Sequence, residues 1–134
     1  MRYCLDTNIW SYLLRKPNDS LIRHLRKRSM KDLCFTDLVK AELLYGACRS
    51  SRAAEIKVQI QDLLRPYGAI PFDDRAAEHY AEIRTHLERE GTPISPNDLI
   101  IAAAVRAAEA TLVTANTREF HRVPGLLCED WTVE

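Results

Sequence analysis

The stretch SPNDLIIAAAVRAAEATLVTAN, residues 95–116, decides the fold of this chain. Ser95 followed by Pro96 predicts a helix start, because a proline at the first helical position loses no hydrogen bond. The apolar run that follows predicts a helix buried in the core, extending to about Glu109. Thr111–Thr114 then has the composition of a strand. A helix of this length leading directly into a strand is typical of a parallel sheet with helical crossovers.

The same alternation of short apolar strands and longer helices extends over the whole chain. We therefore predict an α/β fold: a single domain, residues 1–134, with a central parallel sheet flanked by helices on both faces. A long amphipathic helix over Asp73–Glu90 ends at Gly91, the residue type that best tolerates a left-handed turn. The other predicted strands are Tyr3–Leu5, Lys31–Phe35, Ala69–Phe72 and Leu127–Glu129. The other predicted helices are Thr7–Arg15, Asp19 or Ser20 to Arg28, Thr36 or Asp37 to Cys48, and Ser50 or Ser51 to about Pro66.

Composition and charge exclude several classes of protein. The chain is 46% hydrophobic, has no apolar run as long as the roughly 18 residues of a membrane span, and has no secretory signal. Its cysteines form no CxxC pair and stand in apolar contexts, which indicates reduced thiols that fill core space in a cytoplasmic protein. The formal net charge is zero, which by itself argues against nucleic acid. Residues 15–31, however, hold seven basic side chains and one acidic one, which suits an RNA backbone. The four cysteines are Cys4, Cys34, Cys48 and Cys128.

Four polar residues stand where a parallel sheet places its ligands, at or near the carboxyl ends of strands. Asp6 directly follows the first strand, and Asn116 lies two residues past the strand that ends at Thr114. Asp98 falls in the first turn of the alanine-rich helix. Glu42 lies in a helix whose other side chains are mostly apolar. It therefore needs a partner from elsewhere in the fold, a bound metal or a raised pKa.

Each of these residues also has a purely structural explanation. Asp6 could cap the following helix, and Ser95 with Asp98 has the spacing of a capping box. Asn116 could be a turn residue, and Glu42 could pair with an arginine. The combination favours a site, because clustered carboxylates repel one another and a divalent cation neutralises them. Oxygen ligands without Cys or His select Mg²⁺ or Mn²⁺, which suit hydrolysis of a phosphodiester or phosphate ester.

The motifs around these residues resemble those of a known family. They are Leu5-Asp6-Thr7-Asn8, Lys40-Ala-Glu42-Leu-Leu-Tyr-Gly46, Asn97-Asp98-Leu-Ile-Ile-Ala-Ala, and Leu112-Val-Thr114-Ala-Asn116-Thr-Arg-Glu119-Phe followed by Val123-Pro-Gly125-Leu. In this order and spacing, over essentially the whole chain, they are similar to the PIN-domain ribonucleases, and most similar to the VapC toxins of bacterial toxin–antitoxin systems. One such motif is weak evidence, whereas four in register are specific.

The resemblance implies a Mg²⁺-dependent endoribonuclease, with Mn²⁺ as a substitute, and assigns roles residue by residue. Asp6, Glu42 and Asp98 match the acidic positions that hold the metal. Asn116 falls at a fourth catalytic position, which is Asp in many PIN domains. The neutral amide leaves three carboxylates, so we expect one firm metal site and a weaker second one. Glu119, three residues on, could supply the missing charge.

The same resemblance implies supporting groups, products and partners. Thr7 and Thr114 match hydroxyl positions that orient water or phosphate near the metal. Cleavage is expected to leave a 3′-hydroxyl and a 5′-phosphate on a translation-related RNA, such as the anticodon loop of initiator tRNA. The implied partners are a cognate VapB-like antitoxin, whose C-terminal segment covers the site, and a second toxin copy in a homodimer within a larger hetero-oligomer.

Three alternatives stay open on the sequence alone. A phosphohydrolase of the haloacid-dehalogenase type also has an Asp after its first strand, but it needs a second Asp where this chain has Asn8. A phosphoacceptor receiver domain needs an acidic pair at the first strand and a late lysine, which the segment around Asn116 does not offer. A catalytically weakened PIN scaffold that binds RNA or antitoxin without cutting is compatible with Asn116.

Overall fold

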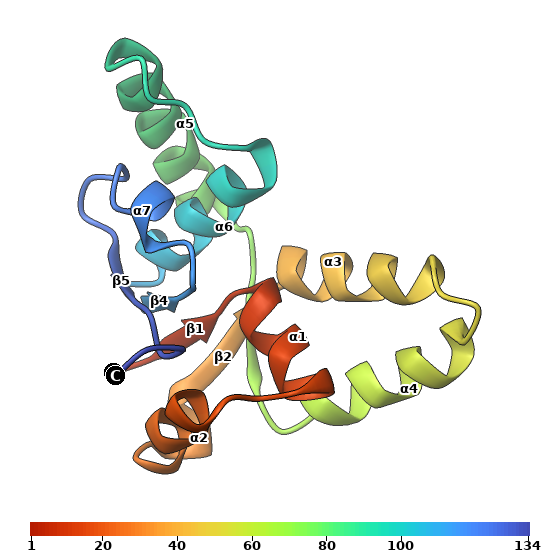
Figure 1. Ribbon diagram of the computed structural model, residues 1–134. Coiled ribbons are helices and arrows are strands. Elements are labelled where there is room, and N and C mark those ends of the chain that lie inside the picture. The colour runs from red at the N-terminus through yellow and green to blue at the C-terminus, as the bar shows by residue number, and fades with distance from the viewer.

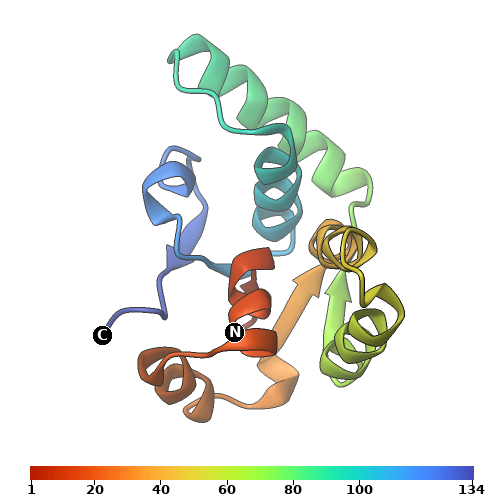
Figure 2. The same cartoon turned by 45° about the vertical axis from the view of Figure 1, so that its right-hand side comes forward.

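Five short parallel strands form the central sheet of the computed structural model, which describes all residues from Met1 to Glu134. Their order across the sheet is β3-β2-β1-β4-β5, and each neighbouring pair is parallel. Figure 2 shows β2 and β3 side by side and pointing the same way. The strands are β1 (Tyr3–Leu5), β2 (Leu33–Thr36), β3 (Gly68–Ile70), β4 (Thr111–Val113) and β5 (Leu127–Glu129).

Helices connect every pair of consecutive strands. The chain moves outward from β1 to β2 and β3, then returns past β1 to β4 and β5. Because crossovers between parallel strands are right-handed, α1 to α4 cover one face and α5 to α7 the other. In Figure 1, α3 and α4 form an arm on one side, and α5 with α6 forms a separate lobe. The helices are α1 (Thr7–Arg15), α2 (Asp19–Arg26), α3 (Asp37–Cys48), α4 (Ala53–Leu64), α5 (Asp74–Arg89), α6 (Pro96–Ala107) and α7 (Thr117–Phe120). The predicted α/β fold with helices on both faces is confirmed.

Side-chain caps explain where most of the helices begin. A cap residue accepts a hydrogen bond from the backbone N–H three residues further on, at the start of five helices. These caps are Asp6, Asn18, Thr36, Asp73 and Ser95. Helix α4 has no such cap and begins at Ala53, slightly later than predicted. The predicted strand start at Lys31 is also wrong, because a 3₁₀ turn occupies Met30–Asp32.

The core lies between the sheet and its helices. Helix α6 contributes most to it, with Leu99 and the run Ile101–Val105 buried, as predicted. The prediction that all four cysteines fill core space is wrong for Cys48, which is exposed because α3 buries only the face of Val39, Leu43 and Ala47. No helix has the length and hydrophobicity that a membrane crossing requires.

Stacked side chains fasten the C-terminal segment to α2 and β1. The Arg28 guanidinium lies 4.3 Å from the ring centroid of Trp131 and 4.6 Å from that of Tyr3. The His24 ring stacks on Trp131 with its centroid at 5.5 Å. Trp131 is fully buried, and its Nε1 donates to Glu129 at 2.9 Å. The chain up to Trp131 is therefore part of the packed structure.

We expect Trp131→Ala to lower the free energy of unfolding by about 3–5 kcal/mol, because it empties a closed site and removes two stacking partners. Urea unfolding followed by circular dichroism measures the effect. Val133→Ala is the control, since Val133 is 57% exposed and should be nearly neutral. A loss below about 1 kcal/mol for Trp131→Ala would show that the segment adds little to stability.

Candidate active site

The polar residues predicted from the sequence meet where the strand order reverses, between β1 and β4. Asp6 follows β1, and its backbone N–H donates to Val113 at 2.9 Å. The Asp6 carboxylate accepts from the N–H of Ile9 at 3.2 Å and caps α1. The hydroxyl of Thr114, the fully buried residue that follows β4, lowers the pKa of this carboxyl. The structural role considered for Asp6 is thus real, and it holds the carboxylate at the sheet edge.

The Asp6 carboxylate is an unfavourable place for a charge. It is 7% exposed, and burial raises its pKa from 3.8 to about 6. Hydrogen bonds from Thr114 and Ile9 lower the pKa, while the nearby charge of Asp98 raises it further. Ionisation of the Asp6 carboxyl is therefore unfavourable in this fold.

Glu42 accepts hydrogen bonds from residues of two other helices. Its Oε1 accepts from Thr7 Oγ1 at 2.5 Å, and its Oε2 accepts from Asn97 Nδ2 at 3.2 Å. These bonds join α3 to the start of α1 and to the start of α6. Asn97 was not predicted as a site residue, although it lies directly before Asp98 in the sequence.

Asp98 combines the capping role and the site position that the sequence suggested. The Ser95 hydroxyl accepts from the Asp98 N–H at 3.3 Å, so the N-cap bond of the predicted capping box is present. The half-buried Asp98 carboxyl has a raised pKa, first because of burial and then because of the charges of Glu119 and Glu42. Because the charge of Asp98 also raises the pKa of Asp6, Asp98 interacts electrostatically with all three of the other acidic residues.

Asn116 and Glu119 lie side by side. The Asn116 Nδ2 donates to Glu119 Oε2 at 2.7 Å, and the Ser95 N–H donates to the other Glu119 oxygen at 3.3 Å. The backbone N–H of Asn116 donates to Thr114 Oγ1 at 3.0 Å. Helix α7, which was not predicted, brings Glu119 back toward the site. The negative charge at this corner therefore belongs to Glu119, and Asn116 positions it.

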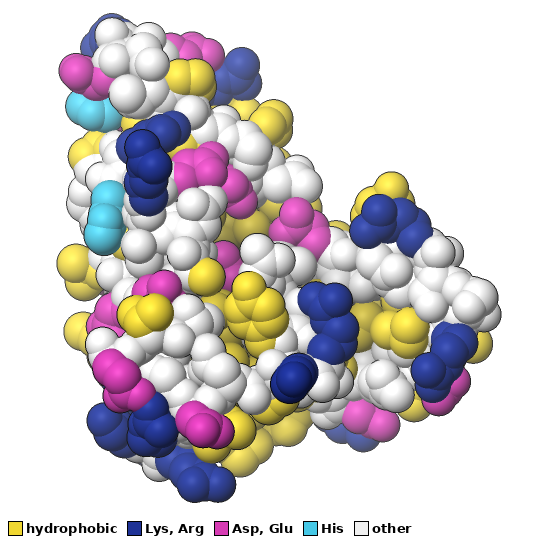
Figure 3. Space-filling model, viewed as in Figure 1, with side chains coloured by type: hydrophobic (Ala, Val, Ile, Leu, Met, Phe, Trp, Pro, Cys, Tyr) yellow, Lys and Arg dark blue, Asp and Glu magenta, His cyan; other side chains and the backbone are white.

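The four carboxylates of Asp6, Glu42, Asp98 and Glu119 form no salt bridge with Lys or Arg; their hydrogen bonds come from hydroxyl, amide and backbone groups. Acidic side chains are visible in the notch between the α5–α6 lobe and the α3–α4 arm (Figure 3). No three acidic, His or Cys side chains converge tightly enough to form a complete ligand set. Oxygen donors carrying unbalanced negative charge nevertheless fit a hard divalent cation.

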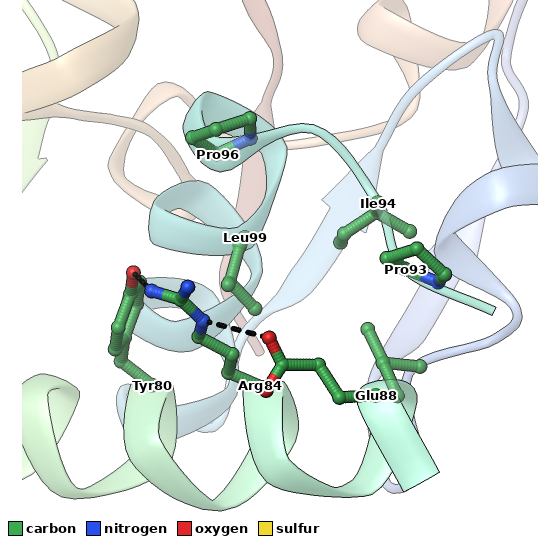
Figure 4. A pocket seen from close by; sticks show the side chains of 8 residues that line it. Tyr80, Arg84, Glu88, Pro93, Ile94, Pro96 and Leu99 are labelled. Atoms are coloured by element: carbon green, nitrogen blue, oxygen red, sulfur yellow. Dashed lines mark hydrogen bonds and ion pairs between the residues drawn. The ribbon is translucent and has the colours of Figure 1, made fainter. Parts of the chain in front are cut away.

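Other candidate groups do not belong to this site. A hollow of about 170 Å³ lies between α5 and the loop before α6 (Figure 4). Arg84, which lines this hollow, is already bonded to Tyr80 and Glu88. His79 accepts from Arg106 at 2.8 Å, and His24 packs against the C-terminal segment.

The basic side chains of segment 15–31 do not share one environment in the fold. Arg23 pairs with the C-terminal Glu134, and Arg28 is packed against aromatic rings. Arg15, at the end of α1, instead lines a hollow that also contains Thr7 and Glu42. The fold separates the charges that are adjacent in sequence.

Comparison with known proteins assigns the family. Residues 3–126 match the PIN domain family. The chain is also 37% identical over 132 residues to Ribonuclease VapC2 of Rickettsia felis, with 98% of each chain covered. It is a PIN-domain protein of the VapC family. This membership removes the haloacid-dehalogenase and receiver-domain alternatives.

Further VapC relatives agree in sequence and in structure. The tRNA(fMet)-specific endonuclease VapC of Shigella flexneri is 33% identical over 132 residues, covering 98% of this chain and 99% of the relative. The crystal structure of R. felis VapBC2 bound to a promoter DNA fragment matches with a TM-score of 0.89 at 36% identity, covering 98% of this chain and 99% of that one. VapBC-1 of nontypeable Haemophilus influenzae matches with a TM-score of 0.91 at 31% identity, with the same coverage. PIN nucleases generally use divalent metal ions, in keeping with the oxygen donors of this VapC-family site.

Proposed function

We propose that this VapC-family protein is the toxin of a toxin–antitoxin pair and cleaves RNA in a Mg²⁺-dependent reaction, with Mn²⁺ as a substitute. The observation that carries the proposal is the gathering of Asp6, Glu42, Asp98 and Glu119 at one edge of the sheet without a basic partner. A structural cluster of acids would be paired with Lys or Arg, whereas a metal site leaves its ligands free of them.

We assign Asp6, Asp98 and Glu42 as the groups that hold Mg²⁺. When bound, the cation would make the attacking water more acidic and would stabilise the charge that develops on the phosphate. Asn116 and Glu119 complete the site, with Glu119 supplying charge where many PIN domains have Asp. Because an amide donates to that carboxylate, we expect a second cation to bind more weakly than the first.

The neighbouring hydroxyl and amide groups act by positioning the acids. Thr7 and Asn97 donate to the two oxygens of Glu42, and the Thr114 hydroxyl favours the charged form of Asp6. Each donor removes rotational freedom from a carboxylate before a ligand arrives, which lowers the cost of forming the site. Ser95, bonded to Glu119, ties the start of α6 to α7 in the same way.

We propose initiator tRNA, cut in its anticodon loop, as the RNA target. Support comes from VapC relatives of S. flexneri and Salmonella typhimurium, which are named tRNA(fMet)-specific endonucleases and are 33% and 31% identical to this chain. We further propose a VapB-like antitoxin as the partner, because the structural relatives are VapBC complexes. We also propose that the protein is cytoplasmic and forms a toxin homodimer within a larger complex.

Mapping of RNA 5′ ends after induction of the protein tests this function. We expect new ends within the anticodon loop of initiator tRNA that carry a 5′-phosphate and are therefore substrates for direct ligation. The purified protein should produce the same ends with Mg²⁺ and none with EDTA. New ends in other RNAs would show that the target is not initiator tRNA. RNA binding without cleavage would identify a catalytically weakened PIN scaffold.

Thr7→Val is expected to lower the cleavage rate about 10-fold and to raise the Mg²⁺ concentration needed for half-maximal rate, because Glu42 loses its shortest hydrogen bond. Thr7→Ser, which keeps the hydroxyl, should restore both values. Thr85→Val is the matched control, since the Thr85 hydroxyl bonds only to a backbone carbonyl on the exposed face of α5. Equal metal requirements for Thr7→Val and the parent protein would remove this role.

A further inference from the structure

The largest hollow of the molecule opens directly from the proposed cleavage site. It has a volume of about 510 Å³ and lies among α1, α3 and α4. Thr7 and Glu42 of the site form part of its wall. Its floor contains the buried apolar side chains of Leu43, Ala47 and Ile60. An RNA strand that leaves the proposed cleavage site on this side would therefore pass over this hollow.

Three arginines stand around this hollow, each from a different part of the helical corner. Arg15 ends α1, Arg49 follows the last residue of α3, and Arg52 precedes α4. Because of the helical rise, Arg15 and Arg49 stand about 10–12 Å along their helices from Thr7 and Glu42, respectively. Figure 3 shows Lys and Arg side chains over the α3–α4 arm and over its corner with α1. Positive charge thus lies about two helical turns from the acidic site, along α1 and along α3.

Two of these arginines are available to an anion. Arg15 donates only to the Ser11 hydroxyl, at 2.8 Å, and forms no salt bridge. The Arg49 guanidinium lies 5.0 Å from the ring centroid of Tyr45, whose side chain is 64% exposed. Arg52, in contrast, is bound by both oxygens of Glu55. An aromatic face orients a guanidinium without neutralising it, so the donors of Arg49 stay free for a ligand.

We propose that Arg15 and Arg49 bind backbone phosphates of the RNA strand next to the cleaved bond; this rests on the proposed ribonuclease function. RNA carries a phosphate at every nucleotide, so a strand held at the acidic site presents anions along the adjoining wall. Guanidinium groups match phosphate geometry with two parallel donors. Along a bound strand, the phosphate at the cleaved bond would face the cation held by the acidic residues. The phosphates further along the strand would face the arginines.

Binding of a fluorescent single-stranded RNA tests the proposal in the Asp98→Asn background, in which the RNA should stay intact. Fluorescence anisotropy in Mg²⁺ over a salt series gives the affinity and its salt dependence. We expect Arg15→Ala/Arg49→Ala to weaken binding about 10-fold or more at low salt, and to reduce the slope of log K against log salt by about 1.4, or about 0.7 for each lost phosphate contact. Arg15→Lys/Arg49→Lys should retain most of the slope.

The matched control is Arg65→Ala/Arg89→Ala, which removes the same charge from exposed positions outside the hollow. This control should bind RNA like the parent, and thermal unfolding should show that both double variants are folded. The proposal is overturned if the two double variants bind RNA equally. It is also overturned if Arg15→Ala/Arg49→Ala loses affinity only for the antitoxin, which would assign the hollow to a protein partner. Failure of the parent chain to cleave RNA would instead contradict the proposed function, because the binding measurement does not require cleavage.

Discussion

Asp98→Asn is expected to lower RNA cleavage by about 10²–10³-fold, equivalent to about 3–4 kcal/mol of activation free energy, while leaving the fold intact. Asp98 interacts electrostatically with each of the other acidic residues. The charges of Glu119 and Glu42 raise the pKa of Asp98, and the charge of Asp98 raises the pKa of Asp6. Removal of the Asp98 charge, which lies at the centre of the cluster, should therefore weaken the binding of a cation. The rate at saturating Mg²⁺ and the Mg²⁺ titration should both change.

Asparagine is the informative replacement because the cap of α6 uses the backbone N–H of residue 98, not its side chain. The melting temperature should therefore stay close to that of the parent protein. Asp62→Asn is the control: it also removes one carboxylate, but from the exposed face of α4, where Asp62 pairs with Arg65. Cleavage by purified Asp98→Asn at the parent rate would show that the reaction does not use this cluster.

Much of this architecture could be predicted because local signals and the global pattern agree. Ser95 and Pro96 predict the start of α6 correctly, and the strand after it was expected within one residue of its observed end. Parallel strands bring their carboxyl ends to one edge, so the positions of Asp6 and Asn116 after neighbouring strands could be predicted from the sequence. Predictions of this kind succeed where one element determines the position of a residue.

The details that could not be predicted depend on contacts between distant segments. Asn97 bonds to Glu42, which is 55 residues earlier, and no periodicity encodes that pairing. Glu119 reaches Ser95 only because a four-residue helix, too short to leave a pattern, turns the chain back. Arg15 and Arg23 look equivalent in a basic run, but one lines the hollow beside the site and the other binds the C-terminal residue. Tertiary packing, not composition, separates their roles.

Asp6→Asn is expected to make the metal-free protein more stable at pH 7, by as much as about 3 kcal/mol. The folded-state pKa of about 6 lies above the ordinary value of 3.8, so ionisation of Asp6 opposes folding. The stability that the protonated acid provides is fully present below about pH 3.8 and is lost as the pH rises through about 6. Asparagine cannot ionise and can still cap α1 through its side-chain oxygen.

The advantage of Asp6→Asn should therefore be absent near pH 4 and should grow between about pH 4 and pH 7. Urea unfolding of both proteins in EDTA over this range measures the difference, in which the other titrating groups largely cancel. Added Mg²⁺ should stabilise the parent protein, because a ligand that binds only the folded state raises the free energy of unfolding. Asp6→Asn should respond weakly, so the difference in stability between the two proteins should become smaller. A lower stability of Asp6→Asn in EDTA at pH 7 would mean that the hydrogen bonds from Thr114 and Ile9 outweigh burial. The charged, buried Asp6 carboxylate therefore lowers the stability of the fold above about pH 6, and a bound cation would offset this loss.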